Sequence, residues 1–175
     1  MDFEEKTLTS KVVYDGKIMT VYKDDVEIST GKKSFREIVR HSGGVVIFAL
    51  KDENTVLAVK QFRYPLGKAI IELPAGKLEK GENPDFASKR ELEEETGYRA
   101  EKWTSLGYIN TTPGFCDEKL YLYKAENLTF VGEHPDDGEV LNCFEIPKSE
   151  LIKKIMSGEI NDAKTICAVF RGLNL

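Results

Sequence analysis

One continuous apolar run constrains the fold of this chain more than any other feature of its sequence. The run Val45-Val46-Ile47-Phe48-Ala49-Leu50 contains no polar residue. Such a run is typical of a strand that is covered on both faces, whereas a strand with one solvated face alternates polar and apolar residues. The sequence therefore predicts a sheet that lies between two layers of other elements. The run is also far too short to span a bilayer.

The rest of the chain supplies both strands and helices. Further strands are predicted over residues 55–62, 69–73, 103–108, 118–125 and 140–146. Helices are predicted over 84–96, from Pro147 to Gly158, and from Asn161 or Asp162 onward. Asn83 is a good N-cap for the first of these helices, and Gly97 is a favoured residue just after its end. The predicted class is α+β, a mixed sheet covered by a few helices.

The two later helices are amphipathic. We expect one side of the first to carry Leu151, Ile152, Ile155 and Met156, and the second to bury Ile166, Val169 and Phe170.

The first forty residues form a different kind of region. They contain three or four short β-type runs, separated by turns at Asp15-Gly16 and Thr30-Gly31-Lys32. Three strands alone make a thin core, so we expect them to pack on something else, such as a second copy of the chain. The sequence thus predicts an N-terminal β-subdomain at 1–40 and a second domain at 41–175.

Composition narrows the class of protein. Lys and Arg number 25 against 30 for Asp and Glu, a net charge of −5, which argues against a nucleic-acid-binding protein. Cys116, Cys143 and Cys167 show no CxxC spacing, which speaks against a disulfide framework or a structural zinc site. The acidic N-terminal segment is unlike a secretory signal. We therefore expect a cytoplasmic protein with no membrane partner.

The helix predicted over 84–96 concentrates acidic side chains. At 100° per residue, Glu91, Glu94 and Glu95 share a sector of about 100°, while Glu93 points to the far side. Carboxylates gathered in this way suit Mg²⁺ or Mn²⁺, which prefer oxygen ligands. The plain alternative is a solvated, charged helix face.

The acidic helix belongs to a longer pattern, G-x5-E-x7-R-E-U-x-E-E-x-G-U, in which U is a bulky apolar residue. Its fixed positions are Gly76, Glu82, Arg90, Glu91, Leu92, Glu94, Glu95 and Gly97. The stretch GKLEKGENPDFASKRELEEETGY resembles the signature of the Nudix hydrolases and differs only at the last position, where Tyr98 replaces the usual aliphatic residue. This resemblance implies the Nudix fold, a mixed β-sheet core packed between helices.

The resemblance also implies roles for individual residues. The backbone carbonyl of Ala75 and the carboxylates of Glu91, Glu94 and Glu95 would ligate the metal, Mg²⁺ or Mn²⁺. Gly76 would let the backbone approach the metal closely. Glu82 and Arg90 would form an ion pair that ties the loop to the helix. The family hydrolyses a nucleoside diphosphate linked to another moiety, with metals bridging the phosphate oxygens and activating water.

Further positions resemble the ADP-ribose pyrophosphatase subgroup. Pro113 lies 16 positions after Gly97, and the segments 61–65, 112–118 and 162–165 are similar to that subgroup's bacterial members. The implied reaction converts ADP-ribose and water into AMP and ribose 5-phosphate. The implied partner is a second copy of the chain, in a homodimer with swapped N-terminal strands. Substrate-binding roles follow by resemblance for Arg36, Arg63, Pro113 and Glu118.

The resemblance places the general base on the acidic loop at 132–139. Glu139 is the first choice because it lies just ahead of the predicted last strand, followed by Asp137 and then Glu133. Two other functions stay open. One is a Nudix hydrolase of another nucleoside diphosphate derivative, such as a GDP-sugar, NADH or a dinucleoside polyphosphate. The other is a non-catalytic ADP-ribose sensor, although no signature glutamate is lost.

Overall fold

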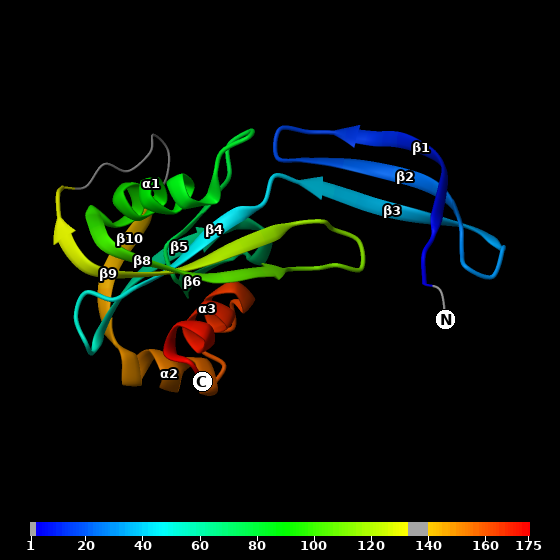
Figure 1. The fold of residues 1–175 in the computed structure, drawn as a ribbon. Helices are drawn as coiled ribbons and strands as arrows, with labels where there is room; N and C mark the ends of the chain where they lie inside the picture. Colours follow the sequence, from blue (N-terminus) through cyan, green and yellow to red (C-terminus); the bar gives the residue numbers. More distant parts are fainter. Residues whose placement is uncertain (1–2, 133–139) are drawn as a thin grey trace. The chain divides into compact units, whose positions relative to one another are not determined.

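The structure is a computed structural model that describes residues 3–132 and 140–175 (Figure 1). The chain divides into two compact units, and each is described by itself. The N-terminal unit comprises residues 1–43 and 110–119, and the larger unit comprises residues 44–109 and 120–175. Segment 110–119 thus groups with the N-terminal strands. The sequence predicts a division into two domains at residue 40 and does not predict this grouping.

The N-terminal unit is an antiparallel sheet of three strands, with β2 in the middle. The strands are β1 (Lys6–Asp15), β2 (Met19–Glu27) and β3 (Lys33–His41). The turns lie at the two predicted places, and Gly31 adopts a φ of +79°, which suits glycine. Segment 110–119 contacts β3, because the backbone N–H of Val39 donates to the carbonyl of Phe115 at 2.7 Å.

The larger unit contains two sheets. The first has the order β7-β4-β9-β8 and is mixed, since β4 pairs parallel with β9 and antiparallel with β7. Its strands are β4 (Gly44–Ala49), β7 (Ala75–Lys77), β8 (Tyr98–Asn110) and β9 (Lys119–Phe130). The second sheet has the order β10-β5-β6 and is antiparallel. Its strands are β5 (Thr55–Arg63), β6 (Lys68–Glu72) and β10 (Leu141–Pro147), and a short 3-10 helix, η1 (Tyr64–Leu66), joins β5 to β6.

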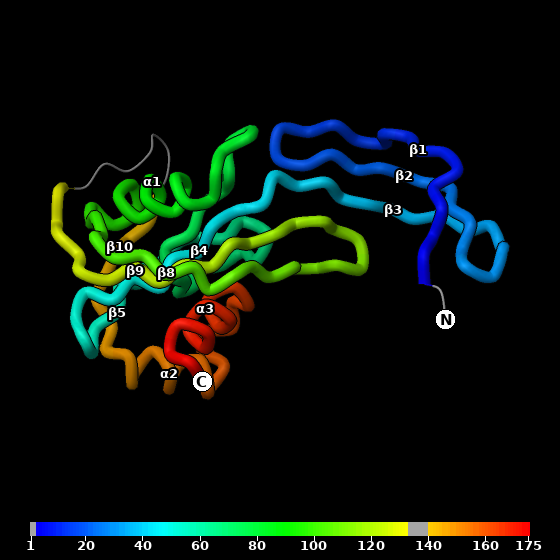
Figure 2. Tube along the Cα trace, in the orientation of Figure 1, coloured from blue at the N-terminus to red at the C-terminus, as the bar shows by residue number. Residues whose placement is uncertain are grey.

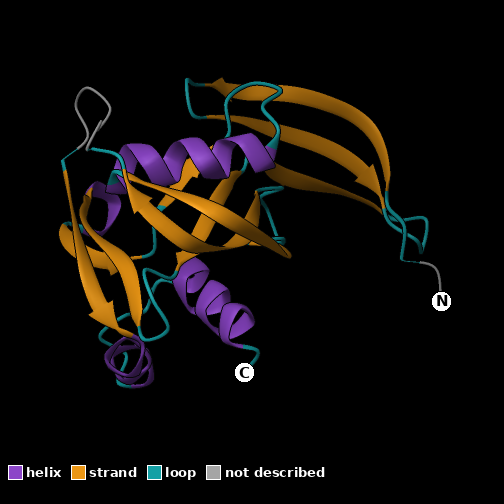
Figure 3. Ribbon diagram, turned by 60° about the vertical axis from the view of Figure 1, so that its left-hand side comes forward, coloured by secondary structure: helices purple, strands orange, loops and turns teal. Residues whose placement is uncertain are grey.

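The described residues of the larger unit also form three helices: α1 (Pro84–Thr96), α2 (Lys148–Met156) and α3 (Ala163–Leu173). Helices α1 and α3 cover opposite faces of the sheet that contains β4 (Figure 3). Val45 and Ile47 belong to the same core cluster as Leu92 of α1, whereas Phe48 clusters with Val169 of α3. Every residue of β4 is buried, which confirms the prediction of a strand covered on both faces.

The amphipathic faces of α2 and α3 differ from the prediction at two positions. Leu151, Ile155 and Val169 are buried as expected, but Met156 is 73% exposed and Phe170 is 37% exposed. Helix α3 packs through residues spaced three and four apart, ending at Gly172, where a Cβ atom would lie 2.3 Å from the Phe48 ring. This close contact fixes the rotation of α3 and turns Phe170 away from the sheet. Met156 follows Ile155 by one residue, about 100° around the helix, and so leaves the buried side.

Within the described residues, no helix is both long and apolar enough to cross a membrane.

Candidate active site

The acidic helix is bounded by the residues that the sequence predicted. The chain leaves β7, passes through residues 78–83 and enters α1 (Figure 2). The side chain of Asn83 accepts a hydrogen bond from the backbone N–H of Asp85 at 2.8 Å, which caps the first turn. Gly97 ends the helix with a φ of +73°. These local signals determine where α1 begins and ends, and so which glutamates lie on the helix.

Arg90 links three carboxylates of this region. Its Nε donates to Oε1 of Glu82 at 3.1 Å and its Nη2 donates to Oε2 of Glu82 at 3.0 Å. Its Nη1 lies 2.9 Å from Oε1 of Glu91 and 2.7 Å from Oε2 of Glu94. The expected ion pair between Glu82 and Arg90 is therefore present, and the same guanidinium also organises two of the expected metal ligands.

The opposite charges of Arg90 and Glu82 shift the pKa values of both groups. Hydrogen bonds to Glu82, and then the charges of Glu91 and Glu94, raise the pKa of Arg90 above its ordinary value against the opposing effect of burial. The hydrogen bonds from Arg90 hold the pKa of Glu82 below its ordinary value, and the backbone N–H of Glu79 adds to this effect. Both groups are thus held in their charged forms, and the loop is fastened to the helix by charge-assisted bonds.

Glu95 fastens the last turn of α1 to the start of β7. Its Oε2 accepts a hydrogen bond from the backbone N–H of Ala75 at 2.9 Å. Glu91 lies against the next residue, because a Cβ atom at Gly76 would come within 1.8 Å of the Glu91 Cδ. Glu91 and Glu95 are 8% and 6% exposed. The structure thus brings together Ala75, Gly76 and two of the helix carboxylates, as the sequence predicted.

The donors in this region fit a hard divalent cation. The carboxylates of Glu91, Glu94 and Glu95 and the Ala75 backbone offer only oxygen ligands, and the missing side chain at Gly76 lets Glu91 lie directly on the strand. Among the described residues, however, no three acidic, histidine or cysteine side chains form a ready-made metal-binding group. Arg90 lies between Glu91 and Glu94 and holds them by ion pairs. The metal role of these residues stays a prediction.

Arg63 lies at the end of β5 beside a buried acid. Its Nε donates to Oε1 of Glu72 at 3.0 Å and its Nη2 to Oε2 at 2.5 Å. Glu72 is 2% exposed and also lies 3.1 Å from the Nζ of Lys164. The hydrogen bonds from Arg63 to Glu72 raise the pKa of the guanidinium, and the nearby charge of Glu95 adds to this. Arg63 therefore interacts electrostatically with Glu95 in the last turn of α1.

Glu72 is a residue of this region that was not predicted from the sequence. Its signal was a single acid at the end of the apolar strand predicted over 69–73, immediately before the loop that carries Ala75 and Gly76. An acid in such a strand needs a cationic partner if it is buried. Which cations pair with Glu72 depends on the tertiary structure and cannot be predicted from the local sequence.

Two of the predicted substrate residues meet within the N-terminal unit. Arg36 and Pro113 line one hollow of about 470 Å³, together with Arg40 and Lys119. Arg36 also forms an ion pair with Glu5 at 2.5 Å. Glu118 does not line this hollow; its Oε2 accepts a hydrogen bond from Thr111 at 2.7 Å.

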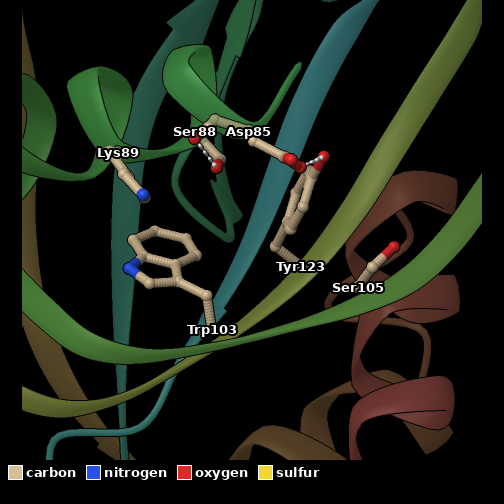
Figure 4. Close-up of a pocket in the computed structure, with 6 residues that line it drawn as sticks. All are labelled: Asp85, Ser88, Lys89, Trp103, Ser105 and Tyr123. Atoms are coloured by element: carbon tan, nitrogen blue, oxygen red, sulfur yellow. Dashed lines mark hydrogen bonds between the residues drawn. The ribbon is translucent and has the colours of Figure 1, made fainter. Parts of the chain in front are cut away.

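A smaller hollow of about 250 Å³ lies on another side of α1 (Figure 4). The hydroxyl of Tyr123 donates to Oδ1 of Asp85 at 2.6 Å, and burial together with this bond raises the pKa of Tyr123. At 100° per residue, Asp85 and Glu94 lie about 180° apart on the helix. This contact anchors the first turn of α1 to β9, which fixes the rotation that presents the glutamates. Nothing in the local sequence pattern predicts this contact.

The predicted general bases Glu139, Asp137 and Glu133 lie outside the described residues.

Comparison with known proteins places this arrangement in a family. The NUDIX domain matches residues 40–169, and the N-terminal domain of nucleoside diphosphate sugar hydrolases matches residues 5–39. The chain belongs to the Nudix family. This confirms the family resemblance, including its N-terminal region, and the chain is accordingly a hydrolase.

Individual relatives of this Nudix chain agree with the family match. A Bacillus subtilis (strain 168) protein named ADP-ribose pyrophosphatase is 45% identical over 168 residues, which cover 95% of this chain and 91% of that protein. A Bacillus methanolicus protein named methanol dehydrogenase activator is 43% identical over 169 residues, with 95% and 91% covered. A crystal structure of an ADP compounds hydrolase superposes with a TM-score of 0.87 at 20% identity, covering 99% of this chain and 95% of that one, and this confirms the fold.

Proposed function

We propose that this chain hydrolyses the diphosphate bond of ADP-ribose and releases AMP and ribose 5-phosphate. The observation that carries the proposal is the carboxylate face of α1, which Arg90 and the Ala75 backbone hold beside Gly76. The name of the Bacillus subtilis relative supports ADP-ribose as the substrate.

We propose that the carbonyl of Ala75 and the carboxylates of Glu91, Glu94 and Glu95 hold Mg²⁺, with Mn²⁺ as a substitute. When bound, such an ion supplies charge neutralisation at the phosphates and a more acidic water. Arg90 keeps Glu91 and Glu94 on one side of the helix and offsets part of their negative charge. Glu82 orients Arg90 in turn through two hydrogen bonds.

The remaining site residues have separate roles in the proposal. Arg63 clamps a substrate phosphate, which its partly exposed guanidinium near Glu95 supports. Arg36 and Pro113 contact the sugar nucleotide, supported by their shared hollow. Glu118 touches the terminal ribose, on the family resemblance alone. Glu139 accepts a proton from the attacking water, with Asp137 as the second choice, on the family resemblance alone.

The N-terminal sheet supports a homodimer. Every residue of β1 is exposed, and large apolar side chains are exposed across the unit: Phe3, Leu8, Val12, Val13, Tyr14, Ile18, Met19 and Phe35. An apolar surface of this kind marks a protein interface. We propose that a second copy of the chain covers it. Light scattering on the purified protein should give a mass of two chains, and Val12→Lys should give one chain.

Product analysis of a substrate panel tests the function. The panel contains ADP-ribose, GDP-mannose, NADH and diadenosine polyphosphates, each with Mg²⁺ and with EDTA. Metal-dependent formation of AMP and ribose 5-phosphate from ADP-ribose, faster than turnover of any other compound, is the expected result. Faster turnover of another compound would mean that this compound, and not ADP-ribose, is the preferred substrate. Tight ADP-ribose binding without turnover would indicate a sensor.

A further inference from the structure

The first turn of α3 holds the strand end that leads into the acidic site. Oδ2 of Asp162 accepts a hydrogen bond from the backbone N–H of Thr165 at 3.0 Å and so caps the helix. The buried hydroxyl of Thr165 accepts a hydrogen bond from the backbone N–H of Leu73 at 3.0 Å. Leu73 follows Glu72 and lies two residues before Ala75. Helix α3 is therefore connected to the backbone that carries a proposed metal ligand.

Lys164, in the same turn, contacts two carboxylates. Its Nζ lies 3.1 Å from Oε1 of Glu72 and 3.0 Å from Oδ2 of Asp162. Its side chain is only 15% exposed. A carboxylate as buried as that of Glu72 is costly unless cations and hydrogen-bond donors satisfy its oxygens. Arg63 and Lys164 both bind the oxygens of Glu72 and together offset this cost.

The four charges of this cluster balance. Glu72 and Asp162 carry two negative charges, and Arg63 and Lys164 carry two positive ones. If Lys164 were neutral, Arg63 would be the one cation of the cluster facing both acids. The Arg63 guanidinium would then interact with Glu72 and Asp162 and would be less available to bind a substrate phosphate.

The geometry leaves one edge of Arg63 for a ligand. The hydrogen bonds to Glu72 use Nε and Nη2. Among residues 3–132 and 140–175, no partner takes a hydrogen bond from Nη1, and the side chain is 37% exposed. Arg63 is bound to Glu72, which lies three residues before Ala75, and the backbone N–H of Ala75 donates to Oε2 of Glu95 on α1 at 2.9 Å. The charge of Glu95 also adds to the rise in the pKa of Arg63.

We propose that Lys164 is a positioning residue: by neutralising Glu72 and Asp162, it keeps the outer edge of Arg63 directed at, and available to, the diphosphate of the substrate. This proposal rests on the proposed function, because it takes a diphosphate as the ligand. Lys164 acts through Arg63 and contacts no reacting atom.

The test compares Lys164→Met with a matched control. Lys154→Met removes a lysine that also contacts two carboxylates, Glu150 and Glu159, on α2 and in the segment after it. We expect Lys164→Met to raise the KM for ADP-ribose about tenfold while kcat changes less than about threefold, as for loss of one charge-assisted contact. Lys164→Arg should restore most of the affinity, and Lys154→Met should leave KM unchanged. An unchanged KM in Lys164→Met would overturn the proposal.

A double-mutant cycle decides whether Lys164 acts through Arg63. Calorimetric titration with inorganic pyrophosphate and Mg²⁺ gives Kd for the wild type, Lys164→Met, Arg63→Met and the double variant. Lys164→Met should weaken binding about tenfold in the wild type and cause no further loss once Arg63 is replaced. Equal losses from Lys164→Met in both backgrounds would overturn the proposal, and so would a wild-type Kd in the Arg63→Met single variant.

Failure of the two proposals can be told apart. The pyrophosphate titration does not depend on turnover or on the sugar nucleotide. If the chain fails to hydrolyse ADP-ribose, the proposed function fails, while the cycle still decides the role of Lys164. If ADP-ribose is hydrolysed and the cycle shows no coupling, only the positioning role fails.

Discussion

A Cβ atom at Gly76 would lie 1.8 Å from the Cδ of Glu91, so the strand and the acidic helix touch at a point where no larger residue fits. Glu91 is nearly buried there and is also held by Arg90 at 2.9 Å. The glycine of the Nudix signature therefore has a steric reason in this chain, in addition to any effect on backbone conformation.

Gly76→Ala should displace the Glu91 carboxylate and lower kcat/KM at least about 100-fold, because each 1.4 kcal/mol of lost transition-state stabilisation is a factor of ten. Gly158→Ala is the control, since Gly158 has a φ of +78° and no atom within 4 Å of its Cβ position. The control should cost about 1 kcal/mol in stability and leave kcat/KM unchanged. Wild-type activity in Gly76→Ala would contradict the steric argument.

Arg90→Met should lower the free energy of unfolding by about 2 kcal/mol, because it leaves three neighbouring carboxylates without their shared cation. Arg99→Met removes an exposed arginine whose ion-pair partner is Glu93. Exposed pairs contribute little, so this control should change stability by less than about 0.5 kcal/mol. Urea unfolding of the two variants makes the comparison, and equal destabilisation would show that the Arg90 network is not special.

Isosteric glutamine variants separate metal ligands from the general base. Glu94→Gln and Glu95→Gln should each lower kcat at least about 100-fold and weaken Mn²⁺ binding, with little change in Tm. Glu139→Gln should lower kcat by a similar factor and leave Mn²⁺ affinity unchanged, because a base holds no metal. Calorimetric Mn²⁺ titration distinguishes the two groups. Retained activity in both helix variants would remove the metal assignment, and an unchanged rate in Glu139→Gln would move the base to Asp137 or to Glu95.

Acid should weaken the contact between the loop and α1. The pKa of Glu82 in the folded protein lies below its ordinary value of 4.5, because Arg90 stabilises the carboxylate. The pair therefore contributes stability above about pH 4.5, and this contribution is lost as pH falls through the lowered folded-state pKa. Tm should fall more steeply below pH 4.5 in the wild type than in Glu82→Gln. The exposed Glu101 provides the control, and Glu101→Gln should keep the wild-type slope.

The sequence predicted those parts of the site that depend on local interactions. Asn83 and Gly97 bound α1 because caps act within one turn, and the spacing of Glu91, Glu94 and Glu95 places them on one side of any helix. The buried strand at 44–49 was predictable because it has no polar residue. Contacts between distant segments were not predictable, because nothing in the local sequence pattern pairs Glu72 with Lys164 or Asp85 with Tyr123. The exposure of Phe170 likewise depends on how closely Gly172 approaches Phe48.

One such distant contact gives the last prediction. Thr165 and Leu73 are 92 residues apart, and Thr165 is fully buried. Thr165→Val keeps the shape of the side chain but leaves the N–H of Leu73 without its acceptor, which should cost about 1–3 kcal/mol in urea unfolding. Thr165→Ser keeps the hydroxyl and should cost less than about 1 kcal/mol. A nearly neutral Thr165→Val together with a costly Thr165→Ser would mean that packing of the methyl group, rather than the hydrogen bond, holds α3 to the strand before Ala75.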